Sequence, residues 1–236
     1  KITGAVDKVI SQVSQLWDKL VSWVQDRVED VRMAFARAKV NKDKAQKACA
    51  AGFEFPTGLT IKNVKDEDIE KIIAKIDDID YDSPDKEKSE FKLDTYITPM
   101  TSATNSELND AFQNVFNTEH TTIGRIRTAK KTSIEALNAL KKEVKGSDDS
   151  DKSEQVKKIN KQCRNISAYS SLAIKAYHTN IDASVKLLQT AVRTNSALNK
   201  ISKNNEKLEK KSEKFAQKYS KTSESAIFTD EWFFIA

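Results

Sequence analysis

The sequence predicts an all-α fold, an elongated antiparallel bundle of long helices with one small insertion that also allows a two-stranded β element. Three observations carry this prediction. The chain has 236 residues but only 5 Gly and 3 Pro, which favours helix over turn-rich β structure. Charged residues make up 32% and hydrophobic residues 38%, as expected of amphipathic helices around a thin core.

The third observation is the stretch from Ser153 to Lys221, which contains neither Gly nor Pro. Apolar residues recur there three and four positions apart, as in helices that pack on other helices. As one helix it would be roughly 100 Å long. Its heptad stripe includes polar residues, which suit contacts with several neighbours better than one tight dimer. These polar positions are Ser170, Asn180, Ser184 and Thr194.

Residues 1–52 are predicted to form an N-terminal amphipathic helix, over about 5–48, with Gly52 as a stop signal. Its apolar stripe is Val6, Ile10, Val13, Trp17, Leu20, Val24, Val28, Val31 and Phe35. A membrane-surface helix would show a similar stripe. Because the opposite face mixes acids with bases, we expect this stripe to pack against the long helix instead.

Residues 53–104 are the predicted insertion. A loop over 53–59 precedes a short helix for which Asp66 is the expected N-cap. Alternation at Phe91, Leu93, Thr95 and Ile97 predicts a strand, which could pair with residues 59–64. Pro99 is expected to close the insertion.

Residues 105–225 are predicted to form a long αα-hairpin. Asn105 or Ser106 should cap a helix over 105–145, Gly124 marks a candidate kink, and Gly146 fits the position after the helix end. The polar loop that follows is short, so this helix should lie antiparallel to the first half of the helix over 153–221.

The C-terminal tail, residues 226–236, is strongly apolar. An exposed cluster of this kind usually docks on a partner surface, either in its own chain or in a neighbouring subunit. The predicted partner-binding residues are Trp232, Phe233, Phe234 and Ile235.

The segment 200–221 holds eight lysines and three glutamates, a net charge of +5. Helical lysines can contact phosphates or an acidic protein surface. A solvated helix face with Glu206 and Lys210 as an i, i+4 pair is the simpler interpretation. The candidate contact residues are Lys203, Lys207, Lys210, Lys211 and Lys214.

Catalytic, cofactor-binding and metal-binding motifs do not emerge from the sequence, so we predict no enzyme and no cofactor. His120 and His178 are isolated. The acidic run Asp78-x-Asp80-x-Asp82 lacks the Gly and the closing Glu of a calcium loop and is predicted to be a solvated turn. Cys49 and Cys163 match no metal spacing and are expected to be buried thiols, although a disulfide between them stays open.

No run of eighteen apolar residues occurs, so the sequence predicts no transmembrane span and no secretory signal. The chain starts at Lys1, which fits either a numbering that begins inside a longer chain or a product cut from a precursor.

A resemblance in helical texture covers mainly Gln155 to Lys200, through Gln162, Cys163, Arg164, Ser167, Tyr169, Tyr177, Gln189 and Arg193. This stretch resembles the helical internal head or virion structural proteins of large tailed bacteriophages. The resemblance implies a protein cut from a precursor during head maturation and located in the virion, and it transfers no site residue.

The sequence therefore predicts a structural assembly protein, most simply a processed virion component in a multi-subunit assembly. Two alternatives stay open: a long-helix pore-forming toxin or secretion-tip protein, and a nucleic-acid-associated scaffold acting through residues 200–221. A secreted or a cytoplasmic location would accompany these alternatives.

Overall fold

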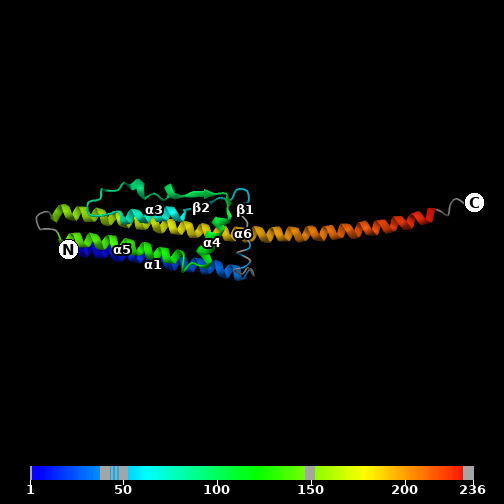
Figure 1. The fold of residues 1–236 in the computed structure, drawn as a ribbon, viewed down its shortest axis with the longest axis horizontal. Helices are drawn as coiled ribbons and strands as arrows, with labels where there is room; N and C mark the ends of the chain where they lie inside the picture. Colours follow the sequence, from blue (N-terminus) through cyan, green and yellow to red (C-terminus); the bar gives the residue numbers. More distant parts are fainter. Residues whose placement is uncertain are drawn as a thin grey trace, which may run out of the picture. The chain divides into compact units, whose positions relative to one another are not determined.

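The computed structural model describes residues 2–37, 43, 45, 47, 53–146 and 152–230. It is predominantly α-helical, with four very short strands paired two by two, which confirms the predicted fold class (Figure 1). The chain divides into two compact units, Lys1–Ala191 and Val192–Ala236.

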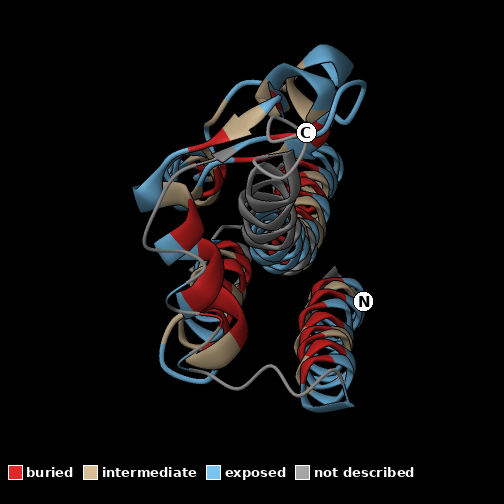
Figure 2. Ribbon diagram, turned by 90° about the vertical axis from the view of Figure 1, so that its right-hand side faces the viewer, coloured by how far each residue is buried: buried red, intermediate tan, exposed pale blue. Residues whose placement is uncertain are grey.

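The first unit is built on three long helices: α1 (Ile2–Arg37), α5 (Thr122–Gly146) and the first part of α6 (Lys152–Asp230). They lie side by side in Figure 1, and α5 runs antiparallel to both others. Their buried faces meet inside this unit, as Figure 2 shows. The α5–α6 pair confirms the predicted antiparallel hairpin.

The apolar stripe of α1 packs into the bundle as predicted. Val6, Val13, Trp17, Leu20, Val24, Val28, Val31 and Phe35 are all buried. Trp17 contacts the ring of Tyr177 on α6, with centroids 6.3 Å apart. The stripe thus faces α5 and α6 in this structure, and a membrane-surface role for it would require α1 to leave the bundle. Apart from positions 43, 45 and 47, residues 38–52 lie outside the described residues.

The insertion contains two small antiparallel β pairs. Strand β1 (Phe53–Glu54) pairs with β4 (Ser102–Ala103), and β2 (Ile61–Asn63) pairs with β3 (Thr98–Met100). Between the first two strands, Gly58 has a φ of 83° in a turn closed by Leu59 N–H donating to the Pro56 carbonyl at 3.0 Å. The loop over 53–59 is therefore present, but its first two residues are a strand.

The expected strand at Phe91–Ile97 is wrong. The structure has two 3₁₀ turns there, η1 (Lys88–Phe91) and η2 (Leu93–Tyr96). The strand begins after them, with Ile61 opposite Met100, Lys62 opposite Pro99 and Asn63 opposite Thr98. Pro99 therefore lies inside a strand instead of closing the insertion, which a two-stranded pair tolerates because each strand has a free edge.

Two predicted helix caps are also wrong. Helix α3 (Asp66–Asp77) begins at Asp66, and the residue before it, Lys65, makes no side-chain cap bond. The Asp66 carboxylate, predicted to cap the helix, is bonded to Arg125 and Asn180 instead. Helix α4 (Asn105–Phe116) is capped by Thr104, one residue earlier than expected. Thr104 and Glu107 form a capping box there.

The predicted continuous helix over 105–145 is broken. Helix α4 ends at Phe116 and α5 begins at Thr122, with the break at 117–121 and not at Gly124. Threonine hydroxyls bond to carbonyls at this break: Thr118 donates to the Val115 carbonyl at 3.2 Å, and Thr121 to the Asn117 carbonyl at 3.1 Å. Such local bonds compete with the helix ladder.

In the second unit, α6 continues from Val192 to Asp230. The predicted long helix over 153–221 is therefore confirmed and is longer at its C-terminal end. It includes the first residues of the predicted tail, 226–230.

Candidate interaction surface and polar pocket

The lysine-rich part of α6 is the candidate interaction surface. All described side chains from Lys203 to Lys214 are exposed, and these residues include the five lysines predicted as contact residues. Leu208 lies among them with 63% of its surface exposed. Within the described part of its unit, α6 is the only element, so this segment packs on no other described element of that unit.

The lysine side chains of this segment carry no ion pair within 4 Å among the described residues. The expected pair between Glu206 and Lys210 is therefore wrong for this structure. Their ammonium groups are therefore unpaired in the described part of the chain, and the exposed Leu208 lies among them.

The predicted tail residues Trp232, Phe233, Phe234 and Ile235 lie outside the described residues. The structure therefore does not test their assignment to partner binding, which stays a prediction.

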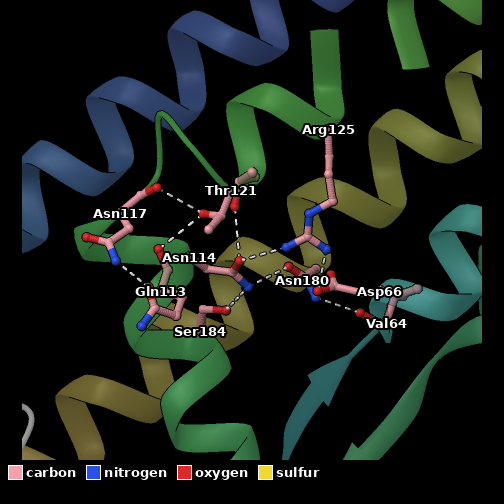
Figure 3. A network of polar contacts seen from close by, with 10 residues as sticks. Val64, Asp66, Gln113, Asn114, Asn117, Thr121, Arg125, Asn180 and Ser184 are labelled. Atoms are coloured by element: carbon pink, nitrogen blue, oxygen red, sulfur yellow. Dashed lines mark hydrogen bonds and ion pairs between the residues drawn. The ribbon is translucent and has the colours of Figure 1, made fainter. Parts of the chain in front are cut away.

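A buried polar network, missed by the sequence analysis in most of its members, joins four helices of the first unit (Figure 3). At its centre, the Asn114 amide of α4 donates to Asn180 Oδ1 at 3.3 Å and to Ser184 Oγ at 3.2 Å, both on α6. Asn114 Oδ1 accepts from Thr122 Oγ1 of α5 at 3.0 Å and from Arg125 at 3.3 Å. Of the polar heptad residues, Asn180 bonds to Asn114, the Val64 carbonyl and Asp66, and Ser184 bonds to Asn114.

Arg125 extends this network to α3. Its guanidinium forms an ion pair with Asp66 at 2.5 Å, and Asn180 also donates to the Val64 carbonyl at 2.9 Å. Asp66 raises the pKa of Arg125 by hydrogen bonding and charge, against the effect of burial. These contacts fix the start of α3 against α4, α5 and α6.

A polar pocket of about 630 Å³ lies beside this network. Four carboxylates line it: Asp66, Glu67, Glu107 and Asp110. Desolvation, with the charges of Asp66 and Glu67, raises the pKa of Asp110. The side-chain oxygen of Asn63, also in the lining, is buried without a hydrogen-bond partner.

The described residues do not gather a catalytic or metal-binding constellation. No group of three or more His, Cys, Asp or Glu side chains in them has the geometry to hold a metal ion. Asp80 Oδ1 accepts from Asp82 N–H and from Ser83 Oγ, both at 3.0 Å, so the acidic run forms the predicted turn. Cys163 is a buried free thiol whose pKa is raised by desolvation, whereas Cys49 lies outside the described residues.

The two histidines occupy different environments. His178 packs on Trp23 of α1, with ring centroids 3.9 Å apart, and His120 is exposed. Burial lowers the pKa of His178, partly offset by the Asp182 carboxylate. Of the two, His178 therefore lies in a packing contact between α1 and α6.

No family model, curated protein or solved structure matches this chain. In the described part of the chain, moreover, none of the helices combines the length and the apolar character that a membrane crossing requires.

Proposed function

We propose that this protein is a non-enzymatic structural protein that assembles with other protein subunits through α6. The observation that supports it most is the exposed segment of α6 from Lys203 to Lys214, with Leu208 63% exposed. A helix of 79 residues is about 120 Å long. A helical segment with solvent on all sides is marginal alone and gains stability by packing on a partner.

The sequence places Leu208 on a heptad stripe with Ile201 and Phe215. A stripe of this kind presents an apolar row to another helix, while its Asn and Ser members keep the contact from being a tight zipper. The apolar tail residues Trp232, Phe233, Phe234 and Ile235 are proposed as a second contact with a neighbouring subunit.

The finer proposal is a virion component of a tailed bacteriophage, processed from a precursor. It is supported by the resemblance in helical texture over Gln155–Lys200. The location in the virion belongs to the same proposal.

The test is light scattering of the full chain over a wide concentration range. We expect a multi-subunit species that Leu208→Lys converts to smaller species, because a charge would enter the apolar contact. The control is Leu59→Lys. Leu59 is also an exposed leucine, but it lies in the insertion and not on α6, so this variant should leave the assembly intact. A chain that stays monomeric at every concentration would contradict self-assembly.

The tail is tested by replacing Trp232, Phe233, Phe234 and Ile235 with Ala in the full chain. Loss of large species would support the tail as an assembly contact, and unchanged assembly would reject that role. Leakage of liposomes caused by the wild-type chain would favour the pore-forming alternative, and salt-sensitive binding to duplex DNA would favour the scaffold alternative.

A further inference from the structure

The exposed lysines of α6 lie on one side of the helix. Each residue of an α-helix advances by about 100°, so positions i, i+4, i+7 and i+11 share one stripe. Lys203, Lys207, Lys210 and Lys214 have this spacing, and we call them the lysine stripe. By the same geometry the three glutamates of the segment lie on one flank of the stripe and Leu208 on the other.

The first unit carries a complementary feature on α3. Glu67, Glu70, Asp77 and Asp78 are exposed and lie on the side of α3 opposite its buried isoleucines, and we call them the acidic stripe. From Asp66 to Asp78 there are six carboxylates and two lysines, a net charge of −4.

The acidic stripe is not neutralised within its own chain. None of its four carboxylates has an ion pair within 4 Å among the described residues. The two lysines of α3 bind residues that do not belong to the acidic stripe: Lys71 pairs with Asp68 at 2.8 Å, and Lys75 Nζ donates to Tyr96 at 3.3 Å. Both stripes thus present unpaired charge of opposite sign.

The two stripes also match in length. Glu67 and Asp78 are eleven positions apart, and so are Lys203 and Lys214. At 1.5 Å per residue each stripe is about 16 Å long. We propose that the lysine stripe of one copy of the protein binds the acidic stripe of α3 on a second copy.

This inference rests on the proposed assembly function and specifies its partner. Because the two stripes are different surfaces, a pair of copies joined by one contact still offers one free lysine stripe and one free acidic stripe. Repeated from copy to copy, this contact builds rings or filaments, and two reciprocal contacts build a closed two-fold dimer. The glutamates beside the lysine stripe would repel a phosphate backbone, which favours a protein partner over a nucleic acid.

Sedimentation velocity of the full chain tests the contact with two charge reversals. The first variant, K207E/K210E/K214E, reverses the lysine stripe, and the second, E67K/E70K/D77K, reverses the acidic stripe. We expect each variant alone to self-associate at least about tenfold more weakly than the wild type. An equimolar mixture should recover association, because each variant keeps the stripe that the other has lost.

The matched control is K131E/K142E/K157E, which changes net charge by the same amount at exposed lysines of α5 and the first part of α6. It should associate as the wild type does. Wild-type association should also weaken between low and physiological salt, since exposed charges are screened.

Three results would overturn the inference: either reversal leaving self-association unchanged, the control weakening it equally, or a mixture that fails to recover it. Loss of binding to a short DNA duplex in K207E/K210E/K214E, with self-association intact, would assign the lysine stripe to phosphate instead. If Leu208→Lys still dissociates the assembly in any of these cases, the proposed assembly function is supported, and only the contact between the two stripes is rejected.

Discussion

Trp17 Nε1 of α1 donates a hydrogen bond to Ser133 Oγ of α5 at 3.2 Å, in the buried centre of the three-helix core. Ser133 Oγ also accepts from Ser170 Oγ of α6 at 3.1 Å and donates to the Ala129 carbonyl at 2.9 Å. One hydroxyl therefore connects all three long helices. Since every partner is buried, the polar groups at this point depend on each other for satisfaction.

Replacing Ser133 with Ala should destabilise the first unit by about 1–3 kcal/mol, because the Trp17 indole N–H would stay buried without an acceptor. Urea unfolding followed by circular dichroism measures the change. Thr128→Ala is the matched control, since Thr128 is exposed on the same helix and also donates to the carbonyl four residues earlier, at 3.1 Å. Equal losses in both variants would contradict a special role for Ser133.

Replacing Asn114 with Ala should cost about 2–3 kcal/mol, because its amide has four side-chain partners from α5 and α6. Thermal unfolding should show a lower midpoint for this variant. Gln113→Ala removes an exposed amide from the adjacent position of α4 and should change the midpoint little. A small effect at Asn114 would mean that water replaces its bonds.

The sequence predicts those features of the fold that depend on local interactions better than those that depend on residues distant in sequence. The stripe of α1, with Val13, Trp17 and Leu20, has one period over many turns, and the structure buries it as predicted. The Thr104–Glu107 capping box was readable as Thr-x-x-Glu but was missed in favour of the neighbouring Asn105 and Ser106.

Other features depend on tertiary partners that no local pattern contains. Asp66 is a good N-cap by type, yet its carboxylate binds Arg125, which is distant in sequence. Phe91 alternates like a strand residue, but its ring packs on Tyr169 of α6 with centroids 4.8 Å apart, inside a 3₁₀ turn. The charge and spacing of the lysines predicted the exposed part of the candidate site. The acidic stripe could be recognised only in the structure, because it depends on which carboxylates of α3 are exposed and without an ion pair.

His178 should make stability depend on pH. Burial against Trp23 lowers its pKa below the ordinary value of 6.5, so the folded state favours the neutral ring. The contribution of the neutral ring to the free energy of unfolding is complete above pH 6.5 and is lost as the pH falls from there through the lowered pKa. His178→Gln should therefore flatten the stability profile below about pH 6.5, as measured by urea unfolding at each pH.

His120→Gln is the control for this profile, because His120 is exposed and is the other histidine of the chain. It should leave the slope unchanged. If His178→Gln keeps the wild-type slope, carboxylates and not this ring determine the pH dependence.

Tyr169 ties the insertion to the bundle. Its hydroxyl donates to a Glu90 carboxylate oxygen at 2.6 Å, while its ring is fully buried on α6. This hydrogen bond lowers the pKa of Glu90, so its contribution is present above the ordinary value of 4.5 and is lost as pH falls through the lowered pKa. Tyr169→Phe should cost about 1 kcal/mol at neutral pH, a value reduced by the exposure of Glu90.

The loss should be local, because Phe keeps the ring packing and removes only the bond to η1. We therefore expect limited proteolysis between residues 78 and 97 to accelerate several-fold in Tyr169→Phe, with cleavage elsewhere unchanged. Tyr81→Phe, in the same insertion, should not accelerate it, because the contact of Tyr81 with Lys158 is through the ring face at 4.9 Å. Equal acceleration in both variants would show that the insertion opens by a route independent of the Tyr169–Glu90 bond.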